Sequence, residues 1–140
     1  MKAKKVNGFT IVEVLVVILL ISLLAVILVP KLVQRVPEAK RRIAKTQIVA
    51  LEQLMSQFMM DCGRYPNQAE GMQSLRDAPP GLNEKWKGPY AKESDLIDPW
   101  GTPFKYERPG TKNPNSFDII SYGSDCQPGG EGDNADIFND

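Results

Sequence analysis

The stretch GFTIVEVLVVILLISLLAVILVP, residues 8–30, decides the fold of the first part of the chain. Almost every side chain from Phe9 to Val29 is apolar, and a helix of that length spans roughly 30 Å, the thickness of the hydrocarbon core of a bilayer. Three lysines precede the stretch, and this positive charge predicts that the N-terminal end stays in the cytoplasm. The sequence therefore predicts a single membrane-spanning helix over residues 9–30, with the rest of the chain exported.

The apolar stretch differs from a cleaved secretory signal near both of its ends. A cleaved signal has small residues after its apolar region, whereas residues 28–32 read LVPKL. Near the other end, Glu13 places a carboxylate within the apolar run, where a charge costs on the order of 3 kcal/mol. We therefore expect the helix to remain part of the working protein and the Glu13 carboxylate to need a partner.

The leader and the residues GFTIVE at positions 8–13 resemble the N-terminal signal of type IV pilins and of the pseudopilins of type II secretion systems. The resemblance implies that a prepilin peptidase cuts between Gly8 and Phe9, removes residues 1–8 and methylates the new amine of Phe9. It also implies that Glu13 meets the terminal amine of a neighbouring subunit, and an amine cation in an apolar environment does need a carboxylate. The alternative is a plain membrane anchor that tolerates one acidic residue.

Length and composition limit what the exported part can be. The chain has 140 residues, so one domain is expected, and a long helix over the first 50 or so leaves about 90 residues for a small head. Removal of the three leader lysines from 17 basic and 17 acidic residues leaves three excess negative charges, which argues against nucleic-acid binding. Histidine is absent, and the chain contains no phosphate-binding loop or dinucleotide motif. We therefore expect a protein that is not an enzyme.

A second helical pattern follows Pro30, which lacks a backbone donor and favours a kink or a locally melted turn. Residues 31–45 are basic, which fits a solvated face, contact with lipid headgroups or salt bridges to a neighbouring subunit. Apolar residues then recur at spacings of three and four: Ile43, Ile48, Leu51, Leu54, Met55, Phe58 and Met59. This stripe predicts an amphipathic helix packed on a core, which should end near Cys62 because Gly63 and Pro66 follow.

The residues after this helix read as loops and two short strands. Residues 104–107 and 116–121 flank a Pro-Gly turn and predict an antiparallel sheet. Trp86 and Trp100 lie beside glycine and proline, and we expect their rings to pin loops onto the head. The run DPWGTPFKY, residues 98–106, resembles the sheet region of major pseudopilins of type II secretion systems.

This resemblance implies an α+β, type IV pilin-like fold, in which a long N-terminal helix packs on a small antiparallel β-sheet head with a calcium loop at its C-terminus. Residues 1–8 are then the leader and residues 9–30 the transmembrane and assembly helix. Residues 31–140 form the periplasmic part, in which the helix continues to about residue 62 and the globular head follows.

Acidic residues and glycines dominate the chain after Ser121. A flexible acidic loop repels itself, and Ca²⁺ would order it by taking about six to eight oxygen ligands. The runs SYGSD and GGEGDNADI in this region resemble the calcium loop of major pseudopilins. The resemblance implies the carbonyl of Tyr122 and the carboxylates of Asp125 and Asp136 as ligands, with Asp133 and a carbonyl near Glu131 as further candidates. The alternative is a disordered acidic tail.

Cys62 and Cys126 are the only cysteines. An exported chain meets an oxidising compartment, in which two thiols within reach usually form a disulfide. Sequence does not show whether their Cα atoms come within about 7 Å of each other. A Cys62–Cys126 disulfide and two unpaired thiols therefore both stay open.

By these motifs the chain is identified as a member of the major pseudopilin family of type II secretion systems. The resemblance implies a structural subunit in the bacterial inner membrane with its head in the periplasm. It implies polymerisation with copies of itself into a pseudopilus that moves folded proteins across the outer membrane. The partners it implies are minor pseudopilins, the prepilin peptidase, an inner-membrane assembly platform and the lipid bilayer, with no nucleic acid among them.

The sequence leaves three alternatives open. A type IV or competence pilin would serve adhesion, motility or DNA uptake, and DNA capture would need a basic stripe that the acidic C-terminal region does not favour. A membrane-anchored, calcium-dependent hydrolase would need a nucleophile with its base, for which no local motif is present. A minor pseudopilin at the filament tip fits the intact Glu13 and the acidic loop less well than the abundant subunit.

Overall fold

The computed structural model describes residues 9–33 and 36–139. The chain divides into two compact units at Val36, and each is described by itself. The leader, with Gly8 and the expected cleavage site, lies outside the described residues.

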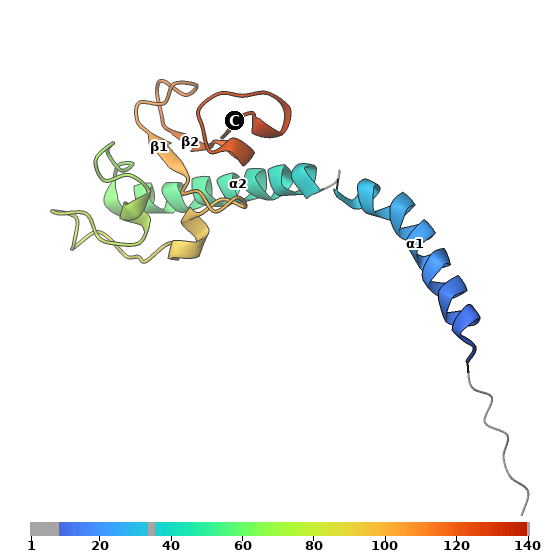
Figure 1. The fold of residues 1–140 in the computed structure, drawn as a ribbon. Coiled ribbons are helices and arrows are strands. Elements are labelled where there is room, and N and C mark those ends of the chain that lie inside the picture. The colour runs from blue at the N-terminus through green and yellow to red at the C-terminus, as the bar shows by residue number, and fades with distance from the viewer. Residues whose placement is uncertain (1–8, 34–35, 140) are drawn as a thin grey trace, which may run out of the picture. The chain divides into compact units, whose positions relative to one another are not determined.

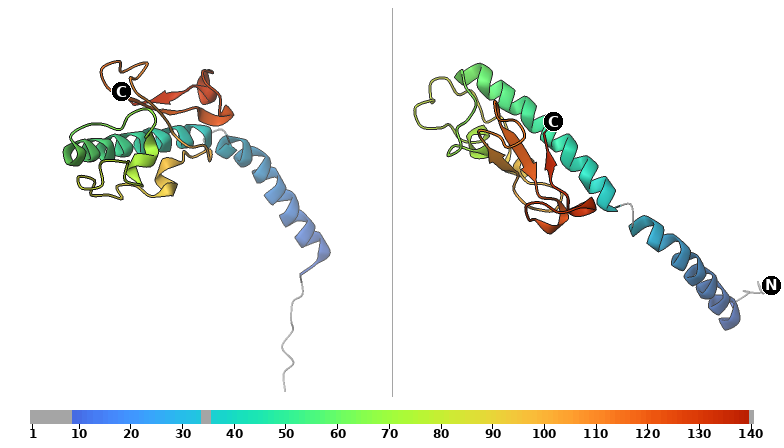
Figure 2. Two further views of the ribbon diagram at one scale, coloured as in Figure 1. Left: turned by 90° about the vertical axis from the view of Figure 1, so that its left-hand side faces the viewer. Right: turned by 90° about the horizontal axis from the view of Figure 1, so that it is seen from above.

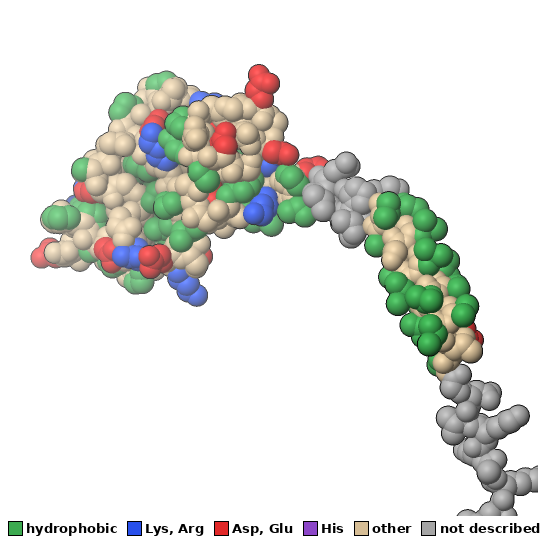
Figure 3. All heavy atoms as spheres, in the orientation of Figure 1, with side chains coloured by type: hydrophobic (Ala, Val, Ile, Leu, Met, Phe, Trp, Pro, Cys, Tyr) green, Lys and Arg blue, Asp and Glu red, His purple; other side chains and the backbone are tan. Residues whose placement is uncertain are grey.

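The first unit contains one helix, α1, which runs from Ile11 to Val33. Within it, Ile11–Leu28 has a mean hydropathy of 3.3 and none of its residues is buried inside the chain. In Figure 3 the side chains of this helix that face the viewer are almost all apolar. The helix is therefore long and apolar enough to cross a membrane, as predicted. It includes Pro30, so the melted turn expected at that proline is not found.

The second unit is built on helix α2, Val36–Cys62. Pro37 lies in its first turn. Backbone N–H groups in a first turn have no intrahelical acceptor, so a proline there costs the helix no hydrogen bond. The buried residues of α2 recur at spacings of three, four and seven: Ala44, Ile48, Leu51, Met55, Phe58 and Cys62. Gly63, with a φ of +78°, ends the helix, and its N–H donates to the carbonyl of Met59 at 2.8 Å. The predicted helix end is confirmed.

The edges of the predicted apolar stripe of α2 are wrong. Ile43 is 52% exposed and Met59 is 43% exposed, whereas Ala44 and Cys62 are buried. At about 100° per residue, Ile43 lies roughly a quarter of a turn from the middle of the buried face, so its side chain points past the core. The small Ala44 lets the head approach the helix closely instead.

A three-stranded antiparallel sheet lies along α2 (Figures 1 and 2), with β2 in the middle of the order β1-β2-β3. Its register pairs Tyr106 with Ile119 and Ser121 with Ile137. The strands are β1 (Lys105–Glu107), β2 (Asp118–Ser121) and β3 (Ile137–Phe138). Four short 3₁₀ helices occur in the connections: η1 (Met72–Leu75), η2 (Glu93–Leu96), η3 (Gly123–Asp125) and η4 (Gly132–Asn134). The first two strands were predicted, and β3 was not.

Two buried carboxylates hold the loops that flank the sheet. Asp98 accepts hydrogen bonds from the backbone N–H groups of Trp100 and Thr102 and from the Ser121 hydroxyl at 2.6 Å. Asp118 is fully buried and accepts the backbone N–H groups of Lys112 and Asn113, in the loop that follows Pro109-Gly110. Because a buried carboxylate is costly unless its oxygens are hydrogen-bonded, these bonds fix the loop conformations around the sheet.

Asn139, next to β3, joins the sheet to α2. Its Oδ1 accepts the backbone N–H of Ile119 at 2.7 Å, and its Nδ2 donates to Glu52 Oε1 at 3.0 Å. The carboxylate of Glu52 is therefore engaged within its own head. The C-terminal strand is held to both layers, which explains why so short a strand is ordered.

Candidate functional site

The N-terminal end of α1 contains a capping box formed by Thr10 and Glu13. Glu13 Oε2 accepts hydrogen bonds from the Thr10 backbone N–H at 3.0 Å and from its hydroxyl at 3.1 Å. The Thr10 hydroxyl in turn accepts the backbone N–H of Glu13 at 3.2 Å. Two backbone donors at the helix end are thereby satisfied, and the carboxylate is held beside the N-terminus.

Two predicted site residues, Phe9 and Glu13, lie at this end of the chain, with Phe9 just before α1 and Glu13 in its first turn. Phe9, the expected new N-terminus, is 85% exposed and immediately precedes Thr10. The Glu13 carboxylate therefore lies at the end of the helix where an amine would arise. The role of Thr10 was missed, although threonine followed three residues later by glutamate is the sequence signal of a capping box.

The remaining surface of α1 offers no polar partner among its described side chains. The one hydroxyl further along, Ser22, donates to the carbonyl of Ile18 in the same helix at 2.7 Å. The large apolar side chains from Val14 to Leu28 are exposed, with relative exposures between 47% and 74%. Such a surface is stable in lipid or against other apolar helices, and it is unstable in water.

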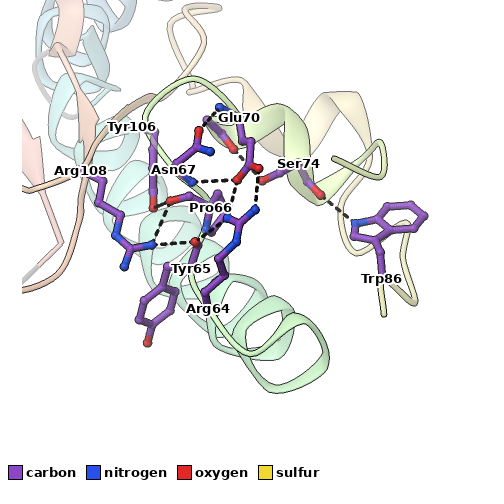
Figure 4. Close-up of polar contacts among 10 residues, drawn as sticks. Arg64, Tyr65, Pro66, Asn67, Glu70, Ser74, Trp86, Tyr106 and Arg108 are labelled. Atoms are coloured by element: carbon purple, nitrogen blue, oxygen red, sulfur yellow. Dashed lines mark hydrogen bonds and ion pairs between the residues drawn. The ribbon is translucent and has the colours of Figure 1, made fainter. Parts of the chain in front are cut away.

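The turn after α2 is a dense polar network, drawn in Figure 4. Both terminal nitrogens of Arg64 bond the Glu70 carboxylate at 2.7 Å. Asn67 and Glu70 cap each other, with bonds of 2.8 and 2.9 Å between side chain and backbone. Its hydrogen bond to Arg64 lowers the pKa of Glu70, and the same bond raises the pKa of Arg64. A bidentate pair of this kind fixes the direction in which the chain leaves the helix.

The same turn is tied to strand β1. Arg108 donates to the carbonyls of Tyr65 and Pro66 at 2.6 and 3.1 Å, and the Tyr106 hydroxyl donates to Pro66 at 2.8 Å. Burial raises the pKa of Tyr106 to about 12, so this hydroxyl stays a donor at neutral pH. The network joins α2 to the sheet and is structural.

The tryptophans play the packing role that was predicted for them. Trp86 and Trp100 are both partly buried against the core of the head. The indole N–H of Trp86 donates to the carbonyl of Ser74 at 2.9 Å, also visible in Figure 4. Each ring therefore closes a loop onto the head.

The predicted calcium ligands lie in the loop that contains η3 and η4, but their side chains do not converge. Asp125 Oδ1 accepts the backbone N–H of Gln127 at 3.1 Å, and Asp133 is exposed. Tyr122 immediately precedes η3. In residues 9–33 and 36–139 no three acidic or thiol side chains are grouped so that they could hold a metal ion.

Asp136 is the exception in this loop because one of its carboxylate oxygens lacks a donor. Its Oδ2 accepts the backbone N–H of Gly129 at 2.9 Å. Its Oδ1 is buried and has no hydrogen-bond partner. A buried, unpaired carboxylate oxygen is costly, and a cation is one group that would satisfy it. Asp136 therefore offers one unsatisfied oxygen ligand, although the other acidic side chains of the loop do not gather around it in the described part of the chain.

The structure does not form the Cys62–Cys126 disulfide. Both thiols are free, with Cys62 buried and Cys126 exposed. The Cys126 sulfur accepts the Thr102 hydroxyl at 2.9 Å, and its loop packs near the start of α2, where Arg41 contacts it. Cys62 lies 21 residues further along that helix, a rise of about 30 Å, so the two thiols are at opposite ends. Burial raises the pKa of the Cys62 thiol, which keeps it protonated and unreactive.

Comparison with known proteins covers both units of the chain. A family model described as type II secretion system (T2SS), protein G, matches residues 31–140, and a model of the prokaryotic N-terminal methylation motif matches residues 3–29.

Curated relatives match along nearly their whole length. The type II secretion system core protein G of Pseudomonas aeruginosa is 36% identical over an alignment of 142 positions, which covers 99% of this chain and 98% of the relative. The protein of the same name from Vibrio cholerae is 37% identical over 140 residues, covering 99% and 94%. The similarity thus spans the apolar helix as well as the head.

A solved structure resembles the described fold. It is the crystal structure of the major pseudopilin from the type 2 secretion system of enterohaemorrhagic Escherichia coli, at 30% sequence identity and a TM-score of 0.59. The match covers 73% of this chain and 87% of that chain. Helix and sheet therefore have a counterpart in an experimental structure.

Proposed function

The chain belongs to the type II secretion system protein G family, the major pseudopilins, and from this premise we propose that it polymerises through α1 into a periplasmic pseudopilus. Growth of that filament from the inner membrane drives folded proteins across the outer membrane. The similarity over the whole chain favours this role over that of a type IV or competence pilin.

One observation carries the proposal: α1 has a continuous apolar surface, and no residue from Ile11 to Leu28 is buried. Before assembly the bilayer covers this surface, and in the filament the helices of neighbouring copies replace the lipid. The exchange is feasible because lipid tails and apolar helices are similar surroundings for these side chains. The helix surface is thus both the membrane anchor and the polymerisation interface.

Glu13 gives the polymer its register. Cleavage after Gly8 creates an amine at Phe9, and in an apolar interior this cation and the Glu13 carboxylate of an adjacent copy stabilise each other. Until that partner arrives, the Thr10 N–H and hydroxyl hold the carboxylate. The prepilin peptidase, an inner-membrane assembly platform and minor pseudopilins complete the proposed set of partners.

Deletion of the gene that encodes this chain, in the bacterium that carries it, tests this function. We expect the loss of exoprotein release into the medium and of sedimentable filaments, with the exoproteins retained folded in the periplasm. Re-expression should restore both. Normal secretion together with a loss of surface adhesion, twitching motility or DNA uptake would contradict the proposal and indicate a pilin.

We also propose that the C-terminal loop binds calcium. The support is the unpaired, buried Oδ1 of Asp136 in an acidic, glycine-rich loop. Asp125, Asp133 and the carbonyl of Tyr122 are the further candidate ligands, and binding would draw the two carboxylates toward Asp136. The metal would neutralise the loop and hold it on the head.

Thermal unfolding of the full chain in detergent, with calcium and with chelator, tests the metal proposal. Calcium at a hundred times its dissociation constant stabilises the folded state by about 2.7 kcal/mol, which is a shift of several degrees or more for a head of this size. Asp136→Asn should abolish the shift, whereas Asp77→Asn, an exposed acid elsewhere on the head, should retain it. A wild-type chain with no calcium-dependent shift would contradict the metal site.

A further inference from the structure

Arg41 and Arg42 are neighbours in α2 but make different contacts. Arg41 is half-buried, and its Nη1 donates to the carbonyl of Ala135 at 2.6 Å and to that of Asp133 at 3.5 Å. Arg42 is 77% exposed and bonds only Glu38, one turn earlier in the helix, at 2.6 Å. One arginine therefore links residues 94 positions apart, and the other stays on the helix surface.

The carbonyls that Arg41 binds also lie against Gly123 in η3. A Cβ at position 123 would be 3.1 Å from the Asp133 oxygen and 3.3 Å from the Ala135 oxygen, and the glycine has a φ of +71°. The loop thus returns on itself here, and a side chain at position 123 would push against these carbonyls in a strained backbone conformation. Arg41 and Gly123 together fix the backbone of residues 133–135.

Asp136 follows directly after this fixed backbone. Its Oδ2 is held by the Gly129 N–H, and its Oδ1 is the buried oxygen without a partner. The position of that oxygen depends on the backbone before it, and Arg41 is the side chain from α2 that holds this backbone. The contacts lie wholly within the second unit of the chain.

We propose that Arg41 is a positioning residue for the metal loop, and this inference rests on the proposed calcium site. It anchors residues 133–135 to α2 so that the Asp136 carboxylate is presented before the metal arrives. Ordering a free loop costs about 1–2 kcal/mol for each residue fixed, so a loop that is already held binds a metal more tightly. Arg41 also links the loop to the first turns of α2.

The sign of the effect separates this role from simple electrostatics. A guanidinium repels Ca²⁺, so loss of its charge alone would strengthen calcium binding. Loss of the anchor would weaken it. Arg41→Met and Arg42→Met remove the same charge from adjacent positions, and only the first removes bonds to the loop.

Calcium titration of the full chain in detergent, by calorimetry, is the test. We expect Arg41→Met to weaken calcium affinity about tenfold, the loss of one charge-assisted hydrogen bond, and Arg42→Met to leave it unchanged or slightly stronger. Arg41→Lys, which keeps one donor, should recover part of the loss. Calcium affinity in Arg41→Met equal to or above that of wild type would overturn the role of Arg41.

Hydrogen exchange in chelator gives a readout that needs no metal. The Gly129 amide, bonded to Asp136, should exchange several-fold faster in Arg41→Met than in wild type or Arg42→Met. Equal exchange in both variants would overturn the anchor. A wild-type chain that binds no calcium would instead overturn the metal site, so the two failures are distinguishable.

Discussion

Helix α1 and the head deal with apolar surface in opposite ways. Between Ile11 and Leu28, α1 buries none of its residues within the chain. The head buries the stripe of α2 under its sheet, and Phe58, Ile48 and Leu51 are at most 1% exposed. The head also uses its buried polar groups, such as Asp118, to hold loops. Helix α1 therefore needs lipid or other helices to cover its apolar side chains, whereas the head buries its own.

This difference separates assembly from folding. Changes in α1 should alter what the chain associates with and leave the head intact, because α1 and the head belong to separate compact units. Changes in the core of the head should lower its free energy of unfolding and leave the apolar surface of α1 as it is. The two regions should therefore respond to mutation independently of each other.

The largest expected effect is the loss of assembly in Glu13→Ala. The variant should be cleaved and inserted normally, but without the carboxylate the Phe9 amine of a neighbour has no partner in an apolar interior, a loss of several kcal/mol per contact. Sedimentable filaments from lysed cells should fall below detection. The melting temperature of the head should equal that of wild type.

Ser22→Ala is the matched control in the same helix. The Ser22 hydroxyl bonds only the Ile18 carbonyl of its own turn, so its removal should leave filament yield unchanged. Normal filaments from Glu13→Ala would refute the role of the carboxylate. A lowered head stability in that variant would show that the two regions are not independent.

The next largest effect is expected for Phe58→Ala in the core of the head. Phe58 is fully buried and packs edge-on against Tyr90, so truncation leaves a cavity and should cost about 3–5 kcal/mol of unfolding free energy. Chemical denaturation of the full chain in detergent measures it. Met60→Ala, two residues away but 78% exposed, should change stability by less than about 0.5 kcal/mol. Similar losses of unfolding free energy in both variants would show that Phe58 is not part of the buried core.

The sequence predicted α1, the end of α2 and the first two strands because these features depend on neighbours in the chain. An apolar run, a period of three to four and the glycine at position 63 are local signals. The Thr10–Glu13 capping box was equally local and was overlooked. The edges of the buried stripe were wrong because Ile43 and Met59 are apolar without facing the sheet.

What could not be predicted depends on contacts between distant residues. β3 is two residues long, and it is held by register with β2 and by the bonds of Asn139 to Ile119 and Glu52. The unpaired Oδ1 of Asp136 and the Arg41 contact likewise exist only once the loop lies on α2. No period or motif in the sequence specifies these neighbours.

The smallest expected effect concerns Glu70 in the turn after α2. Arg64 and the backbone N–H of Asn67 donate to its carboxylate. Glu70→Gln removes the negative charge and weakens the bond to Arg64. The substitution should therefore lower the free energy of unfolding by about 2 kcal/mol at pH 7. Glu38→Gln is the control, because its bond to Arg42 is equally short but exposed and should contribute less than about 0.5 kcal/mol. Denaturation of both variants at pH 7 measures the difference.

The dependence on pH tests the cause of this effect. The bond to Arg64 lowers the pKa of Glu70 below its ordinary value of 4.5, so the unfolded chain takes up this proton first as the pH falls. The stabilisation is therefore complete above about pH 5.5 and is lost as the pH falls through the folded pKa. Glu70→Gln should lose less stability than wild type over that interval, and Glu38→Gln should follow wild type. Parallel curves for all three proteins would show that the turn owes its stability to packing rather than to the ion pair between Glu70 and Arg64.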